Sequence, residues 1–379
     1  MRIVLILFLL IALPAVPNDY QSMISEARTC FETGRHEACD SILTQMRGMK
    51  LKRLQHRKVC TLWLDNTYQT GRHQDFLEAV NSKYVKRYLD RSDYKYWKIL
   101  SELPPTKAIW PDEPELLPLK FIGPQDGVMY GVDVKVNGRT LVGSIDNCCV
   151  HYCSISASLA EELGVRPIGK KVAMNGNRNS MSYIGIVDSI SIGSLVVKNV
   201  LVDVSETITA VQQTYPFDII IGGNVLRHVG DMVINNEDET IMFTNKTLDL
   251  PANVTWSYAN HDYFVEAIMN GRSVRMLFDT GNTKTYLNQQ YNDHFPEDTA
   301  YVKGKMTTTM IDRTFYSDVY VVENAHLEFC GAECQLPSVV IKLKDYTPKT
   351  ADGNIGVNAL RQFRTIVYNA GKLYLKLAQ

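Results

Sequence analysis

The sequence has no excess of either charge, because 40 Lys and Arg residues stand against 41 Asp and Glu residues and leave a formal net charge of -1. Proteins that bind nucleic acids or anionic membranes usually carry a cationic surplus, so we expect neither partner. The sequence also has no Cys-x-x-Cys and no His-Glu-x-x-His motif, which argues against structural zinc and against a zinc hydrolase. We therefore expect no metal and no cofactor.

The apolar run at the start of the chain is short. It extends from Ile3 to Leu13, whereas a helix needs about 20 apolar residues to span a bilayer. Met1-Arg2 precedes it and Pro14-Ala15-Val16-Pro17 follows, a pattern typical of a secretory signal. We expect residues 1–17 to be a signal peptide, with an uncleaved anchor as the alternative. The mature protein would then be exported, to the periplasm or outside the cell, without a stable membrane span.

Export permits disulfides among the eight cysteines. Only Cys330 and Cys334 suggest a local pair, because Gly331-Ala332-Glu333 could form a turn between two strands. The sequence leaves the pairing of the other six open.

A chain of 379 residues predicts more than one folding unit. Residues 18–103 have apolar residues at helical spacing, and the phrase Thr33-Gly34-Arg35-His36 recurs as Thr70-Gly71-Arg72-His73. This resembles a short stack of tetratricopeptide helical hairpins, although two units are fewer than such repeats normally need. We expect a small helical domain that packs on its neighbour, with a protein partner as a further role.

Six prolines crowd residues 104–127, which excludes continuous helix and interior strand. We expect a linker here. The chain that follows is rich in Val, Ile and Thr with Asn-Gly turns, which predicts sheet.

This β-rich part is duplicated. Asn137-Gly138-Arg139 and Asp146 reappear 133 residues later as Asn270-Gly271-Arg272 and Asp279. Further on, the segment from Ile221 to Arg227 aligns with the segment from Ile355 to Arg361 and shares its Ile, Gly, Asn, Leu and Arg. A period this long indicates a duplicated domain, which we divide into lobes 128–247 and 248–379.

The second copy reads Met276-Leu277-Phe278-Asp279-Thr280-Gly281, with Asn354-Ile355-Gly356 further along. It resembles the active-site turn and second signature of the pepsin-like and retropepsin-like aspartic proteases. The resemblance covers about residues 128–379. It implies a mainly β, bilobed acid-protease fold of two retropepsin-like barrel lobes, preceded here by the small α-helical domain.

The resemblance also implies a chemistry. Two close carboxylates share one proton, because like charges at that distance cannot both ionise. The ionised acid activates water as a base and the protonated one donates to the substrate carbonyl. We expect Asp279 and Asp146 to form this dyad, Thr280 and Gly281 to position the turn, and a peptide or protein to be the substrate.

The first copy departs from the pattern, since Asn147 stands where the family has Thr or Ser, and Cys148 where it has Gly. The Asn amide could replace one hydrogen bond, whereas Cys148 adds a side chain where little room is expected. Three hypotheses follow: an active monomeric endopeptidase, a weak or inactive pseudoprotease that binds extended peptides, and an enzyme active only as a homodimer through Asp279. A nucleophilic Cys148 lacks a recognisable His-Asp set, and we interpret His151 as a loop residue.

Two hairpins are candidates to cover the substrate, one near Met174 and Tyr183 and the other near Phe315 and Tyr316. We expect a peptide to pair with strand edges beneath them, and Met174, Tyr183 and Phe315 to contact it. Ordinary sheet packing explains each of these side chains equally well.

Overall fold

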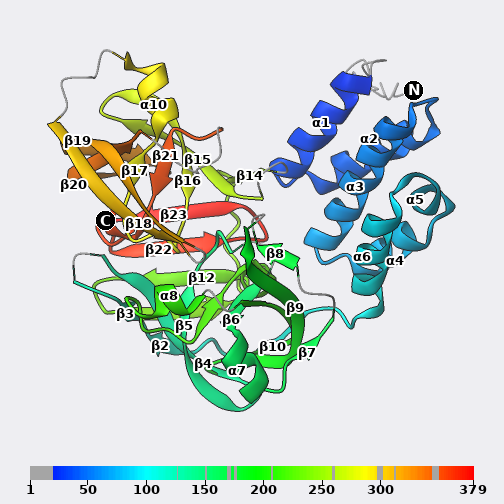
Figure 1. The fold of residues 1–379 in the computed structure, drawn as a ribbon, viewed down its shortest axis with the longest axis horizontal. Coiled ribbons are helices and arrows are strands. Elements are labelled where there is room, and N and C mark those ends of the chain that lie inside the picture. The colour runs from blue at the N-terminus through cyan, green and yellow to red at the C-terminus, as the bar shows by residue number, and fades with distance from the viewer. Residues whose placement is uncertain are drawn as a thin grey trace, which may run out of the picture. The chain divides into compact units, whose positions relative to one another are not determined.

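The computed structural model describes residues 20–125, 127–149, 152–168, 172–174, 177–205, 208–257, 261–296, 302–310, 313–343 and 350–379 (Figure 1). The chain divides into two compact units, one helical and ending at Ser101, the other comprising Glu102–Gln379 together with the short segment Glu32–Gly34. None of the helices in these ranges combines the length and the apolar character needed to cross a bilayer.

The first unit confirms the helical region that the periodicity predicts. Gly34 and Gly71, the repeated glycines, have φ values of 74° and 66° and turn the chain between consecutive helices. Asn66 is fully buried and donates to Asp40 Oδ1 at 2.7 Å, and Arg72 pairs with the same carboxylate. The likeness to tetratricopeptide repeats stays a prediction. The helices are α1 (Tyr20–Glu32), α2 (His36–Gly48), α3 (Arg53–Gln69), α4 (His73–Asn81), α5 (Lys83–Tyr88) and α6 (Arg91–Glu102).

The first lobe is a barrel. Its strands follow the order β1-β10-β6-β11-β5-β4-β9-β7, with β3 on β4 and β8 on β9, and an extra β10–β9 pairing closes a ring of β10, β6, β11, β5, β4 and β9. The elements are β1 (Lys107–Ile109), β3 (Lys120–Ile122), β4 (Met129–Val136), β5 (Arg139–Ile145), β6 (Cys153–Ser156), α7 (Ala157–Glu162), β7 (Arg166–Pro167), β8 (Val172–Met174), β9 (Asn177–Ile192), β10 (Leu195–Ser205), α8 (Ile208–Gln212), β11 (Ile219–Ile221) and α9 (Gly223–Leu226).

The second lobe repeats this topology. The order β14-β15-β16-β21-β17-β20-β19-β18 is closed by a β15–β19 pairing, so each ring strand has a counterpart in the first lobe. The predicted bilobed, mainly β fold is thereby confirmed. The elements are β14 (Thr255–Trp256), β15 (Tyr263–Met269), β16 (Arg272–Phe278), β17 (Tyr286–Leu287), α10 (Gln289–His294), β18 (Val302–Met310), β19 (Arg313–Phe329), β20 (Ala332–Lys342), β21 (Gly353–Ile355) and α11 (Val357–Leu360).

A five-stranded sheet joins the lobes in the order β2-β13-β12-β22-β23, and Figure 1 shows β12 beside β22 between them. Asp231 is buried in this sheet, where Asn369 donates to its Oδ1 at 2.6 Å and the Tyr374 hydroxyl donates to the same oxygen. The strands are β2 (Leu116–Pro118), β12 (Asp231–Asn235), β13 (Thr240–Thr244), β22 (Thr365–Asn369) and β23 (Tyr374–Ala378).

The proline-rich segment 104–127 does more than link. It supplies β1, β2 and β3, which pair with β10, β13 and β4. Both β1 and β2 are edge strands, where a residue without an N–H is tolerated. The prolines therefore confine the segment to short strands at the sheet borders without keeping it out of the sheets.

The suggested Cys330–Cys334 pair does not form. Cys330 occupies the two-residue turn between Phe329 and Ala332, whereas Cys334 lies further along β20, opposite Leu327. All eight cysteines are free thiols. The turn predicted over Gly331-Ala332-Glu333 forms one residue earlier, at Cys330-Gly331, and the register of its hairpin separates the two sulfurs.

Candidate active site

Each predicted catalytic acid follows the last residue of a barrel strand. Asp146 follows β5 and Asp279 follows β16, and each donates its backbone N–H at 3.1 Å to a carbonyl of the neighbouring parallel strand, that of Ile221 or Ile355. The two apolar strands predicted to support the turns thus lie behind them.

The glycines of these motifs permit close approach of backbone segments. A Cβ on Gly222 would lie 2.0 Å from the Tyr152 carbonyl oxygen, and one on Gly356 would lie 2.6 Å from the Lys284 carbonyl carbon. A Cβ on Gly281 would lie 2.2 Å from Asp146 Cγ. Gly281 therefore lets the second turn rest directly against the carboxylate of the first.

Asn147 and Thr280 bond the two turns to each other. Asn147 Oδ1 accepts the Thr280 N–H at 2.7 Å, and Asn147 Nδ2 donates to the Phe278 carbonyl at 2.8 Å. In return, Thr280 Oγ1 accepts the Asn147 N–H at 3.0 Å. The Asn amide, with one acceptor and one donor end, bonds to both a backbone N–H and a backbone carbonyl of the opposite turn.

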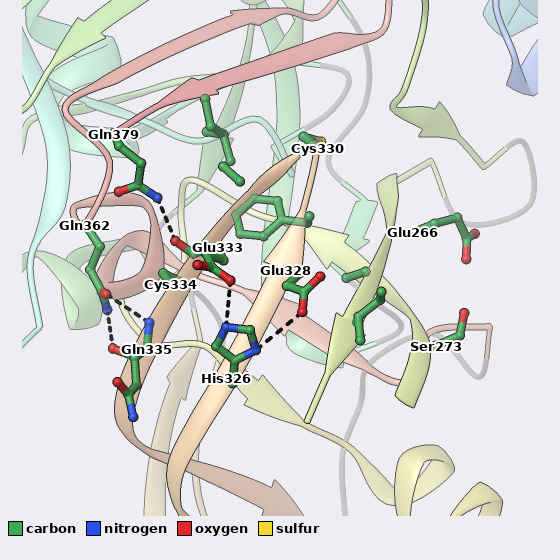
Figure 2. Close-up of a pocket in the computed structure, with 16 residues that line it drawn as sticks. Glu266, Ser273, His326, Glu328, Cys330, Glu333, Cys334, Gln335, Gln362 and Gln379 are labelled. Atoms are coloured by element: carbon green, nitrogen blue, oxygen red, sulfur yellow. Dashed lines mark hydrogen bonds and ion pairs between the residues drawn. The ribbon is translucent and has the colours of Figure 1, made fainter. Parts of the chain in front are cut away.

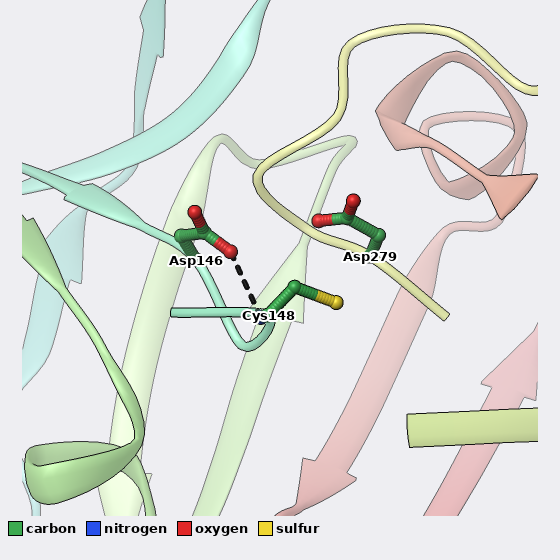
Figure 3. A group of neighbouring side chains, drawn as sticks. All are labelled: Asp146, Cys148 and Asp279. Carbon is green, nitrogen blue, oxygen red and sulfur yellow. Dashed lines mark hydrogen bonds between the residues drawn. The ribbon is translucent and has the colours of Figure 1, made fainter. Parts of the chain in front are cut away.

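The carboxylates of the predicted dyad lie close to each other. One oxygen of Asp146, one oxygen of Asp279 and the Cys148 sulfur all lie within 4.8 Å of one another. Figure 3 shows the carboxylates facing each other, with the thiol on the side of Asp279. Two acids predicted from separate lobes therefore form one cluster.

Burial and mutual repulsion disfavour two charges here. Burial, and then the charge of Asp279, raise the pKa of Asp146 to about 7. Burial also raises the pKa of Asp279, against hydrogen bonds from the Asn354 amide, the Gly281 N–H and the Cys148 thiol. The pair thus retains a shared proton at pH values where ordinary aspartates have lost theirs.

Cys148 fits without displacing the turn. Its N–H donates to Asp146 Oδ1 at 2.8 Å, as the Gly281 N–H does to Asp279 Oδ1 at 2.9 Å. Its side chain leans onto an apolar cluster of Phe264, Leu277 and Ala351. Burial, and then the Asp279 charge, raise the pKa of this thiol well above its usual value, which disfavours a nucleophilic thiolate. His151 lies outside the described residues.

A third carboxylate, Asp262, was missed from the sequence. Burial, and then the charge of Asp279, raise its pKa to about 7. The register of the hairpin that turns at Asn270-Gly271 would have predicted its position. Phe264 pairs with Leu277 across this hairpin, so the same register two residues further on sets Asp262 opposite Asp279.

The candidate covering hairpins form as strand pairs. β8 pairs with β9 at Val172 and Ser182, and β18 pairs with β19 at Met306 and Ser317. Tyr183 is half-buried on β9. The side chains of Met174 and Phe315 lie outside the described ones, so the substrate contacts stay predictions.

A separate groove of about 980 Å³ lies on the second lobe (Figure 2). There His326 lies 3.5 Å from Glu328 and 3.1 Å from Glu333, and the three form one of two groups in the described ranges that could hold a metal ion. The other is Asp146, Cys148 and Asp279. His326 Nε2 forms a hydrogen bond with Glu333, so this ring nitrogen already has a partner within the group.

Residues 132–225 match the model of a family described as aspartyl protease. The first lobe matches this family. The match includes Asp146, Asn147 and Cys148, so the altered lobe still carries the pattern of the aspartyl protease family. No curated protein sequence gave a significant match to the chain.

Solved structures similar to this chain include two aspartic proteases and a soybean globulin. The aspartic proteinase from Irpex lacteus has 13% identity and a TM-score of 0.44, over 70% of this chain and 97% of its own. A retropepsin-like aspartic protease from Rickettsia conorii has 14% identity and a TM-score of 0.25, over 36% and 96%. Basic 7S globulin from soybean has 10% identity and a TM-score of 0.40, over 71% and 95%. Function must therefore be inferred from the two acidic turns and the family match.

Proposed function

We propose that this protein is an exported aspartic endopeptidase with Asp146 and Asp279 as its catalytic dyad. The observation that carries the proposal is the approach of the two carboxylates to within 4.8 Å, each at the end of an equivalent strand. The cross-bonded Asn147 and Thr280 support it, because they fix the two turns relative to each other.

The proposed reaction is hydrolysis of a peptide bond by water. The ionised member of the dyad removes a proton from a water held between the carboxylates, and that water attacks the peptide carbonyl carbon. The protonated member donates to the carbonyl oxygen, which gives a tetrahedral diol. Proton transfer to the amide nitrogen then lets the C–N bond break. The raised pKa of Asp146, about 7, supplies the acid at acidic to neutral pH.

The proposed substrate is an extended segment of peptide or protein. The strand pairs β8–β9 and β18–β19 are the proposed covers, with Tyr183, Met174 and Phe315 as contacts. An edge-paired peptide beneath them would be shielded from water. The signal-like residues 1–17 support export.

Cys148 favours a second candidate, a pseudoprotease that binds peptides without cleaving them. Its sulfur lies among the dyad oxygens, within the same 4.8 Å, where catalysis needs a water. Substitution by the family residue tests this directly, since Cys148→Gly would create turnover in a protein that otherwise only binds.

The experiment uses the mature protein and a library of unstructured peptides, with fragments identified by mass spectrometry. We expect cleavage that is lost in Asp279→Asn and in Asp146→Asn, while both variants still bind a peptide whose scissile amide is replaced by a hydroxyethylene group. Cleavage that persists in Asp279→Asn would refute the endopeptidase. Unchanged turnover in Asp146→Asn would instead favour the homodimer. Binding without fragments in the wild type would favour the pseudoprotease.

A further inference from the structure

The two dyad carboxylates receive different sets of hydrogen bonds. Asp146 accepts the Cys148 and Cys149 N–H groups at 2.8 and 3.1 Å, both on Oδ1. Asp279 accepts the Gly281 N–H on Oδ1 and, in addition, the Asn354 side-chain amide on Oδ2 at 3.0 Å. The turn donors are counterparts of each other, whereas the Asn354 amide has no counterpart in the first lobe.

Asn354 occupies a position that the duplication makes apolar in the other lobe. It is the central residue of β21, between β16 and β17, and its equivalent on β11 is Ile220. Ile220 packs in an apolar cluster with Ile122 and Phe217. Asn354 is 1% exposed, and a buried amide in place of an apolar side chain costs stability unless its polar atoms are bonded.

The bonding of Asn354 is incomplete. Among the described residues its Oδ1 has no hydrogen-bond partner. The amide therefore donates to Asp279 while its own buried oxygen stays unpaired, which costs stability. The reverse orientation would turn Oδ1 toward the carboxylate and leave the two N–H donors of Nδ2 without that acceptor. The orientation with Nδ2 toward Asp279 leaves fewer buried groups unpaired.

We infer that Asn354 is a positioning residue that holds Asp279 as the ionised member of the dyad and leaves the shared proton on Asp146. The inference rests on the proposed function and assigns its two roles: Asp279 is the base toward water, and Asp146 is the acid toward the substrate carbonyl. Donors bonded to a carboxylate favour its charged form. Asp279 has them on both oxygens, whereas the described contacts of Asp146 bond Oδ1 alone.

The other groups near Asp279 do not explain this asymmetry. Asp146 and Cys148 face it from the turn after β5, and Asp262 faces it from the start of β15. The charge of Asp279 helps to raise the pKa of both aspartates to about 7, so both are neutral when Asp279 first ionises and neither favours its charge. The Cys148 thiol donates to it, but Asn354 is the larger of the two side-chain contributions that lower the pKa of Asp279.

The test is a titration of the full mature chain by carbon NMR with aspartate labelled at Cγ, assigned with Asp279→Asn and Asp146→Asn. Asn354→Leu removes the donor at similar volume, and Asn354→Ala removes it without crowding. We expect the first proton loss of the dyad to move up by about one unit in both variants. The acid limb of the kcat/KM profile on a cleaved peptide should move equally.

The matched control is Ile220→Leu, at the equivalent position of the first lobe, which should leave the titration unchanged. An unshifted or lowered titration in the two Asn354 variants would overturn the inference, and a lowered one would mean that the Asn354 amide oxygen accepts a hydrogen bond from protonated Asp279. The titration requires no turnover. If the wild type cleaves no peptide but the two Asn354 variants show the shift, the endopeptidase alone is refuted. If the wild type cleaves peptides but the variants show no shift, the role of Asn354 alone is refuted.

Discussion

At the scale of single residues, the duplication makes the differences between lobes informative. Asp262 lies opposite Asp279 in the register of the second hairpin, and the same count across the first hairpin sets Met129 opposite Asp146. An acid therefore lies near Asp279, whereas the equivalent position of the first lobe is a methionine whose sulfur lies 3.5 Å from the Ser144 hydroxyl. The charge of Asp262 contributes to the raised pKa of Asp146, behind burial and Asp279.

Removal of this third acid should move the pH range of catalysis. Burial and the charge of Asp279 raise the pKa of Asp262 to about 7, so Asp262 carries a negative charge only near and above that pH. In Asp262→Asn the pKa of Asp146 should therefore fall and the alkaline limb of kcat/KM should move to lower pH, by up to about one unit, while the acid limb stays in place. The measurement is the pH profile of peptide cleavage. Glu266→Gln changes an exposed acid on the same strand and should leave the profile unchanged. A profile in Asp262→Asn identical to that of the wild type would contradict the prediction.

At the scale of elements, the Asn-Gly hairpins and the strands around them could be predicted because their signals are local. Asn137 and Asn270 have φ values of 47° and 50°, as the predicted two-residue turns require. The prediction of a linker over residues 104–127 was incomplete. A high density of prolines excludes helix and interior strand, but it does not exclude short strands at the edges of a sheet. The role of Asn354 could not be predicted, because its partner Asp279 lies 75 residues earlier in the sequence.

The link between the turns predicts how the first turn tolerates substitution. Asn147→Ala removes the bonds to the Thr280 N–H and the Phe278 carbonyl, and leaves these buried groups unpaired. We expect a loss of about 2–4 kcal/mol in the free energy of unfolding and at least a hundredfold loss of kcat. Denaturant unfolding and peptide kinetics measure the two effects.

Asn147→Thr is the matched control for this prediction. A Thr hydroxyl can also accept one hydrogen bond and donate another, so this variant should retain most of the stability and the activity. Equal losses in Asn147→Thr and Asn147→Ala would show that the two hydrogen bonds do not account for the role of Asn147.

At the scale of the whole molecule, the dyad should cost stability at neutral pH. The pKa of Asp146 rises from 3.8 to about 7 on folding, so the folded protein binds a proton that the unfolded chain releases. The stabilisation from this proton is present below about pH 4 and is lost as the pH rises toward 7. An Asn side chain at position 146 is neutral at every pH and takes up no proton on folding. We therefore expect Asp146→Asn to raise Tm by several degrees at pH 7.5 but much less at pH 4. Calorimetry at both pH values measures this, and an equal gain at both would contradict it.

The extent of the β-rich unit gives a last prediction about the whole chain. Leu119 and Ile122 are 5% and 4% exposed, and the strands β1, β2 and β3 cover the free edges of β10, β13 and β4. A fragment of residues 102–379 should therefore unfold cooperatively by circular dichroism. A fragment of residues 128–379, which begins where the sequence placed the first lobe, loses these strands and opens the cluster that contains Ile122 and Phe217. It should be less stable by at least about 3 kcal/mol and prone to aggregate through its exposed edges. Equal stability of the two fragments would mean that the segment before residue 128 contributes nothing to the fold.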